Sequence, residues 1–331
     1  MSVREIKQGP AHTMADCGVF AALSLVLVLI STYVPLIGMV ASLVWAVPII
    51  VVVLRRGAGA GAAASVVVLI LAILFTGPVA GFVAGVSIGI FGVTYGYCFK
   101  RSMVPGKTLF IGTVAAGIVA VITLAFSVFL TSLPLSSMID SMEEAFRSVF
   151  RQYDEMGLLT QILPAGTTAE EYIDSMVAMF QRLLPGVIVL SAMAMAALNY
   201  IFAYIILKKA GFVISPLAPF RDWHLPWWIM WGMVPVLLCY LMGKQLDGQY
   251  YFAIAQNILY IYLPLFLISG ISIMSYLFRF WHLSTGAQAV IWVLCGLFMS
   301  FALPFVVIIG AVDVIVDYRN ILQGLQKKSQ K

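Results

Sequence analysis

Three charged residues close the last long apolar run of this chain, which ends IIGAVDVIVDYRN at residue 320. A spacing of four places the carboxylates of Asp313 and Asp317 on one face of a helix, and Arg319 can pair with one of them only if the helix end bends. We expect both carboxylates to lie at the membrane edge, solvated by water, and to serve interaction more than stability. Helix termination with interfacial anchoring, contact with a basic loop or partner, and binding of a coupling ion all fit these residues.

Uncharged polar residues are few inside the apolar runs: Asn199 and Tyr200 in one, Gln256 and Asn257 in another. A buried amide in lipid needs a hydrogen-bond partner, so each predicts a contact to another helix. Lining of a polar substrate cavity is the alternative interpretation.

Groups suited to catalysis are scarce. The sequence EEAFR at 143–147 is one residue short of the EExxxR pattern of intramembrane prenyl proteases, and the three histidines lie at or near loops. The chain has no HExxH, P-loop or dinucleotide fingerprint, and its four cysteines are far apart. We therefore expect no enzymatic activity, no metal and no cofactor. Without a basic patch interleaved with aromatics, we also expect no nucleic-acid partner.

The composition indicates what must position these residues, because 62% of the chain is hydrophobic and 10% is charged. Such a chain fits a lipid bilayer, which an apolar helix of about 20 residues crosses. The predicted fold is all-α, a polytopic transmembrane bundle of nine spans, with eight as the alternative. The spans are 15–35, 37–54, 58–76, 79–99, 108–131, 185–207, 226–243, 250–278 and 286–312. Pro48 and Pro264 make the second and eighth candidates for broken helices or half-crossings.

Basic residues in short loops predict the orientation. A cytoplasmic N-terminus places Arg4 and Lys7, then Arg55 and Arg56, Lys100, Arg101 and Lys107, and later Lys208, Lys209 and Arg221 on the cytoplasmic side. Nine crossings would put Lys327, Lys328 and Lys331 outside, whereas eight would keep them inside. The side of the C-terminus stays open.

One polar region interrupts the spans. Residues 132–184 hold eight of the fourteen acidic residues and contain two stretches with apolar residues at helical spacing, the second after a Thr168 cap. We predict two outer amphipathic helices that act as a cap, a lid over a cavity or a docking surface. The predicted segments are 1–131 (five spans), 132–184 (outer insertion), 185–313 (membrane helices) and 314–331 (basic tail).

Small residues predict close helix packing. Gly77, Gly81, Gly85 and Gly89 recur every four residues, and in lipid such a ridge lets helix backbones approach each other. A backbone-lined substrate path is the alternative.

Several stretches together resemble the YybS-like family of bacterial membrane proteins, which carries the DUF2232 domain. They are FRDWHLPWW at 220–228, ALNY at 197–200, AQNILYIYLPLFLISGIS at 255–272 and GAVDVIVDYR at 310–319. The last is similar to a G-x-x-D-x-x-x-D-[FY]-R pattern matched by Gly310, Asp313, Asp317, Tyr318 and Arg319. This resemblance implies a multi-pass protein of the bacterial cytoplasmic membrane.

The first six spans are also similar to the substrate-binding S-components of energy-coupling-factor (ECF) transporters. Gly18 and Ala22 in the first span match the small-x-x-x-small face through which such a helix meets its coupling subunit. The resemblance implies a small-molecule binding or transport component that has no ATPase and depends on membrane partner subunits. The alternative hypothesis is a membrane scaffold or assembly factor that recruits other proteins.

Overall fold

Prolines and glycines divide the chain into helices. Pro35, Pro78 and Pro105 stand in the first turn of their helices, where the missing N–H costs nothing. Gly57 and Gly77 have φ values of 96° and 90° and separate consecutive helices. The computed structural model describes residues 10–131, 135–158, 163, 166–246 and 248–322, and within them it holds helices and no strand. The predicted all-α class is confirmed.

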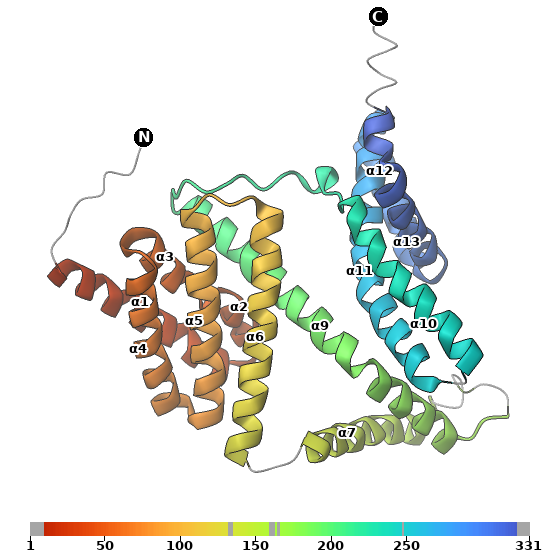
Figure 1. Cartoon of the computed structure of the whole chain (residues 1–331), viewed down its shortest axis with the longest axis horizontal. Coiled ribbons are helices and arrows are strands. Elements are labelled where there is room, and N and C mark those ends of the chain that lie inside the picture. The colour runs from red at the N-terminus through yellow and green to blue at the C-terminus, as the bar shows by residue number, and fades with distance from the viewer. Residues whose placement is uncertain (1–9, 132–134, 159–162, 164–165, 247, 323–331) are drawn as a thin grey trace, which may run out of the picture. The chain divides into compact units, whose positions relative to one another are not determined.

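The helices follow in order along the chain (Figure 1). They are α1 (Pro10–Tyr33), α2 (Pro35–Val44), α3 (Val47–Arg56), α4 (Ala58–Thr76), α5 (Pro78–Lys100), α6 (Pro105–Thr131), α7 (Leu135–Glu155), α9 (Ala169–Lys209), the 3-10 turns η1 (Phe220–Asp222) and η2 (Trp227–Gly232), α10 (Met233–Leu246), α11 (Gln249–Phe280), α12 (Thr285–Leu297) and α13 (Met299–Val316). Among the described residues, nine helical stretches are long and apolar enough to cross a membrane, as predicted.

Two compact units make up the chain, and each is described by itself. Unit 1 contains residues 1–152 and 189–216, and unit 2 contains residues 153–188 and 217–331. The four predicted segments follow composition instead of contacts, and they stay a prediction. The basic residues Arg4, Lys7, Lys327, Lys328 and Lys331 lie outside the described residues.

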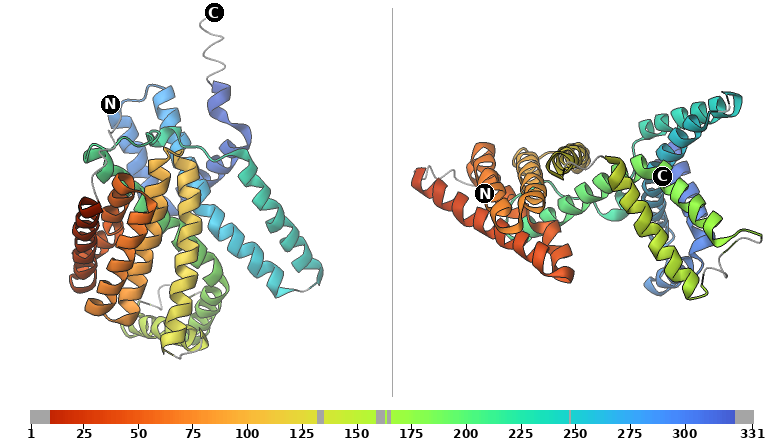
Figure 2. Two further views of the ribbon diagram at one scale, coloured as in Figure 1. Left: turned by 60° about the vertical axis from the view of Figure 1, so that its left-hand side comes forward. Right: turned by 90° about the horizontal axis from the view of Figure 1, so that it is seen from below.

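In unit 1, α4, α5 and α6 lie side by side, and α3 packs against α4 and α5 (Figures 1 and 2). The core is aromatic around Tyr95, which is fully buried and donates its hydroxyl to the carbonyl of Ala196 at 2.7 Å. Tyr200 stacks at 5.5 Å from Phe99 and lies 6.1 Å from Tyr95. These side chains fill the space between α5 and the second half of α9.

In unit 2, α10 and α11 form an antiparallel hairpin, and α13 packs along α11 (Figures 1 and 2). The predicted ninth span, 286–312, is not one helix, because the chain breaks at Phe298 between α12 and α13. Conversely, α11 continues through Pro264 as a single helix. The second span does break, at residues 45–46 between α2 and α3.

The sixth span and the second outer amphipathic stretch form one helix, α9, although the sequence predicted them as separate elements. Its start is a capping box, as the Thr168 cap predicted: the backbone N–H of Glu171 donates to Thr168 Oγ1 at 3.3 Å, and the Thr168 N–H donates to Glu171 Oε2 at 3.0 Å.

Candidate functional site

The closing motif bends sharply at Asp317. Helix α13 ends at Val316, and Asp317 adopts the left-handed conformation (φ 51°, ψ 60°), which aspartate tolerates better than most residues. Its backbone N–H donates to the carbonyl of Asp313 at 2.9 Å, and its carboxylate accepts from the backbone N–H of Asn320 at 3.4 Å. The chain therefore turns back and returns Arg319 to the helix.

This bend creates a buried ion pair. Arg319 Nη2 lies 3.6 Å from Asp313 Oδ2, and only 8% and 3% of the two side chains are exposed. Our expectation that water solvates both carboxylates is therefore wrong for Asp313, although Asp317 is exposed. The physical reason is that other segments of unit 2 cover the end of α13.

Ser272 connects the pair to a distant segment of the chain. Its hydroxyl accepts from Arg319 Nη2 at 3.0 Å, and its oxygen lies 2.7 Å from the carbonyl oxygens of both Phe220 and Trp223, which share its single proton. The guanidinium also lies over the ring of Tyr276 at 5.7 Å. Three of the quoted stretches, FRDWHLPWW, LISGIS and GAVDVIVDYR, thus meet at one place, which we call the Arg319 centre.

Glycines bring the two supporting helices together. A Cβ atom on Gly310 would collide with the backbone of Phe266 in α11, and one on Gly270 would collide with the backbone of Val306 in α13. Phe266, Val307 and Val314 form an apolar cluster beside this contact, and Leu225 and Met230 of the loop before α10 pack against it. The contact between α11 and α13 thus places a polar centre within an apolar shell.

Some hydrogen-bonding atoms of the Arg319 centre have no partner among the described residues. Asp313 Oδ1, Arg319 Nε and Arg319 Nη1 are buried and have no hydrogen-bond partner among the described residues. Burying a polar atom without a partner costs about 1–3 kcal/mol, and more for a charged group. The unpartnered atoms are two donor nitrogens of the guanidinium and one acceptor oxygen of the carboxylate.

The four residues predicted to line a substrate cavity do not all lie in one unit. Asn199 and Tyr200 are buried in unit 1, whereas Gln256 and Asn257 belong to unit 2. The amide of Asn199 donates to Met195 of its own helix at 3.0 Å. Gln256 is exposed.

Asn257 joins α11 to α9 beside Pro185, where α9 continues but its backbone hydrogen bonding is interrupted. Its Nδ2 donates to the carbonyl of Arg182 at 2.7 Å, and its Oδ1 accepts from the backbone N–H of Gly186 at 2.6 Å. In an unbroken helix, these two backbone groups would pair with each other. Pro185 lies between them and has no N–H, so Asn257 supports the helix where its backbone hydrogen bonding is weakest.

The predicted glycine ridge lies mostly against α4. Cβ atoms on Gly81 and Gly85 would collide with the backbones of Ile73 and Leu69, and one on Gly89 would lie 3.2 Å from Ser65 Cβ. Gly77 is not part of this face, because it separates α4 from α5.

Gly18 and Ala22 are exposed on α1, and no atom lies within 4 Å of a Cβ built on Gly18. Among the described residues of unit 1, no helix therefore packs on this small-residue face.

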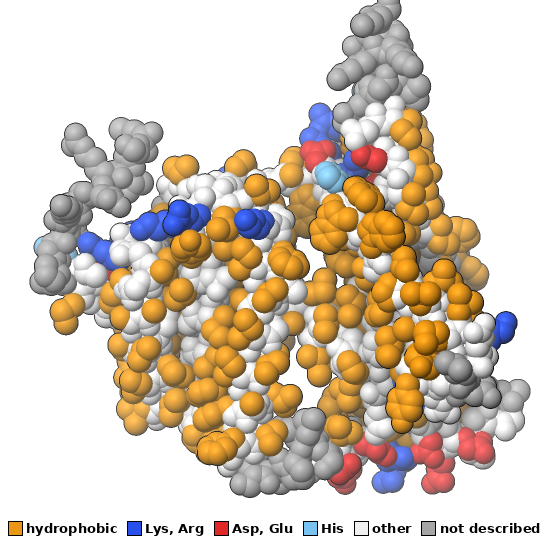
Figure 3. All heavy atoms as spheres, viewed as in Figure 1, with side chains coloured by type: hydrophobic (Ala, Val, Ile, Leu, Met, Phe, Trp, Pro, Cys, Tyr) orange, Lys and Arg blue, Asp and Glu red, His pale blue; other side chains and the backbone are white. Residues whose placement is uncertain are grey.

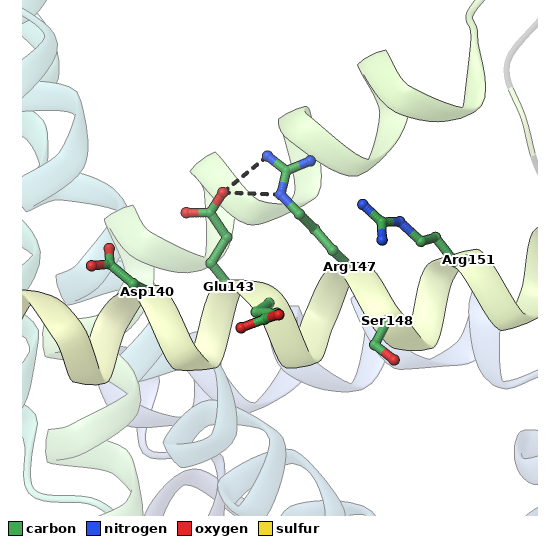
Figure 4. A pocket seen from close by; sticks show the side chains of 6 residues that line it. Asp140, Glu143, Arg147, Ser148 and Arg151 are labelled. Atoms are coloured by element: carbon green, nitrogen blue, oxygen red, sulfur yellow. Dashed lines mark hydrogen bonds and ion pairs between the residues drawn. The ribbon is translucent and has the colours of Figure 1, made fainter.

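A second group of charged residues lies along α7. Asp140, Glu143, Arg147 and Arg151 border a shallow open hollow, in which Arg147 Nη2 pairs with Glu143 at 2.9 Å (Figure 4). Every one of these residues comes from the same exposed helix. Among the described residues, no group of histidine, cysteine and acidic side chains could hold a metal ion.

The apolar helices and the absence of strands among the described residues define an α-helical protein that spans the membrane several times. The chain belongs to the family described as "Predicted membrane protein (DUF2232)", whose model matches residues 22–314. It is 24% identical over 315 residues to the "Uncharacterized protein YybS" of Bacillus subtilis (strain 168), covering 93% of this chain and 98% of that protein. No solved structure matches the chain.

Sequence reasoning missed Ser272, Tyr276 and Gly270 as parts of the site. The small residues of LISGIS offered a signal, since Ser269 and Gly270 mark a close helix contact.

Proposed function

We propose that the protein is a non-enzymatic component of the bacterial cytoplasmic membrane that binds or transports a small polar molecule. In this proposal its N-terminus is cytoplasmic, and the Arg319 centre holds the molecule. The observation that carries the proposal is a nearly buried pair of opposite charges on which three polar atoms have no partner among the described residues. Ionisable residues within apolar helices are costly and mark ligand or ion sites in many membrane proteins.

The position of this centre in unit 2 differs from what the S-component resemblance implies, which is a site among the first six spans. In unit 1, Tyr95, Phe99 and Tyr200 occupy the interior beside α5. The Arg319 centre, by contrast, combines both signs of charge with free hydrogen-bonding capacity. Transport would still need partner subunits for energy, because the sequence has no ATPase motif.

Native mass spectrometry of the protein purified into lipid nanodiscs tests the proposal. We expect wild type to retain a small polar molecule, and Arg319→Gln to lose it. Arg147→Gln removes an arginine from the exposed helix α7 and should retain the molecule. The proposal is wrong if wild type retains none, or if folded Arg319→Gln retains the same amount.

A membrane scaffold or assembly factor is the second candidate, and the exposed face of Gly18 and Ala22 favours it. Small residues on an open helix face permit close approach of a partner helix. A photo-crosslinker at Gly18 should then capture a membrane protein, whereas one at Leu74, exposed on α4, should not. Equal capture from both positions would remove this candidate.

A further inference from the structure

Basic side chains gather at one end of the unit 1 helices. Helix α3 ends in Arg55 and Arg56, α5 ends in Lys100, and α9 ends in Lys208 and Lys209. Arg101 and Lys107 flank the turn between α5 and α6. Figure 3 shows Lys and Arg side chains in a row across this end. We call these seven residues the basic rim.

Contacts show that the helix ends that carry the basic rim lie close to one another. Arg55 lies 5.9 Å from the ring of Phe212, which follows α9, and Lys100 Nζ lies within 3.9 Å of a Cβ built on Gly57. Ser215 donates to the carbonyl of Ser102 at 2.8 Å and so joins the segment after α9 to the α5–α6 turn.

Two turns at the opposite end of the α1–α5 helices carry no charge. The turn between α1 and α2 and the turn between α4 and α5, at residues 33–35 and 76–78, contain no ionisable group except the Tyr33 phenol. The charged residues of α1 to α5 are Asp16, Arg55, Arg56 and Lys100, and all of them lie at the end of the basic rim, whereas α9 begins with Glu170 and Glu171.

Few acidic residues of the described part of the chain pair with the basic rim. Asp16 pairs with Arg56 at 2.7 Å. Among the described residues, the other six cations form no ion pair. The rim therefore keeps a large positive charge.

Aromatic rings orient three of these cations. Arg55 lies 5.5 Å from the ring of Phe20, Arg101 lies 5.4 Å from that of Tyr97, and Lys208 lies 5.7 Å from that of Tyr204. A ring attracts a cation and fixes its position, but it does not cancel the charge. The side chains are thus held in place while their charge stays available to an anion.

We propose that the basic rim binds the phosphate groups of anionic lipid headgroups. The rim lies where five apolar spans begin or end, which is the depth at which lipid phosphates lie. Its cations come from several helices, so one headgroup can contact two spans at once. This position at the ends of membrane helices favours lipid over a soluble acidic protein.

Thermal unfolding in nanodiscs of defined composition tests this proposal. We expect the melting temperature of wild type to rise as phosphatidylglycerol replaces phosphatidylcholine, and 0.5 M salt to reduce the rise by screening. The triple variant Arg55→Gln/Lys100→Gln/Lys208→Gln should lose most of the rise. Arg147→Gln/Arg151→Gln/Lys244→Gln removes equal charge elsewhere and should keep it.

Two further arms separate the sources of the anion. Inorganic phosphate and an acidic peptide are each added to wild type in phosphatidylcholine discs, where we expect neither to match the effect of phosphatidylglycerol. If either one matches it, or if the rim variant keeps the full rise, the lipid assignment is overturned. If the triple variant folds poorly, the test is repeated with Lys100→Gln/Lys107→Gln, which changes two exposed lysines. We expect this variant to lose a smaller part of the rise in melting temperature.

Discussion

At the scale of single residues, Arg319 stabilises a carboxylate that water does not reach. In Arg319→Gln, Asp313 stays buried without its cation, and removing one partner of a buried pair costs about 3–5 kcal/mol. We therefore expect a clear fall in the melting temperature of the purified variant. Asp317→Asn is the control, because Asp317 is exposed and asparagine also tolerates the left-handed conformation. Equal melting temperatures of the two variants would contradict a buried charge pair.

Asn257 supports α9 where the helix passes through Pro185. Asn257→Leu would leave the Gly186 N–H, which is shielded from solvent, without its partner, at a cost of about 1–3 kcal/mol, whereas the exposed Arg182 carbonyl can bond to water instead. The adjacent change Gln256→Leu alters an exposed side chain and should leave stability nearly unchanged. Thermal unfolding of the two variants in the same nanodiscs measures the difference. A loss of stability in Gln256→Leu as large as that in Asn257→Leu would argue against the supporting role.

The pairing and burial of the residues in the Arg319 centre could be predicted from the sequence only in part. The sequence indicated that Arg319 pairs with a carboxylate if the helix end bends, and Asp317 supplies that bend. Burial of Asp313 could not be foreseen, because Ser272 and the segment at 220–223 come from distant parts of the chain. Spacing along one helix says nothing about which other segment covers it.

At the scale of elements, α5 approaches α4 through glycine. Gly85→Ala would place a Cβ 2.6 Å from Leu69 Cα and force the helices apart, with loss of dispersion contacts. Gly117→Ala adds the same atom to the middle of α6, where nothing lies within 4 Å, and alanine favours a helix. We expect Gly85→Ala to lower the melting temperature and Gly117→Ala to keep or raise it. An equal fall in the melting temperature of both variants would contradict close packing of α5 on α4 through Gly85.

Helix type was easier to predict than helix limits. Apolar runs of span length predicted nine crossing helices, and that number of long apolar helices is present among the described residues. The break at Phe298 follows Gly296 by two residues, but the apolar run continues through it without a charged residue, so 286–312 was predicted as one span. The predicted boundary between residues 184 and 185 is absent, because α9 continues through Pro185, where Asn257 accepts the Gly186 N–H.

At the scale of the whole molecule, the helices α12 and α13 decide on which side of the membrane the C-terminus lies. Gly310 lies beside Phe266, and Arg319 lies beside Ser272, so α11 and α13 run in the same direction (Figure 1). Helix α12, which connects them in the chain, runs in the opposite direction and has only 13 residues, fewer than a full crossing needs. We therefore expect the chain to end on the side where α11 ends.

Cysteine labelling in a cysteine-free background checks this topology. Single cysteines at Gly57 and Lys328 should both be shielded from a membrane-impermeant reagent in intact cells, whereas one at Ser141 should react. Basic loops favour this orientation, with α7 outside. Reaction at Gly57 but not at Ser141 would invert the orientation. Reaction at Lys328 alongside Ser141 would place the C-terminus outside.

The most direct test of the Arg319 centre compares the single changes Asp313→Asn and Arg319→Gln with the double change. Neutralising both partners removes the uncompensated charge, so the double variant should melt closer to wild type than either single variant. If the centre binds a ligand, native mass spectra of the stable double variant should still show no retained molecule. A stable double variant that retains the wild-type ligand would contradict the account and leave the pair as a support for the end of α13.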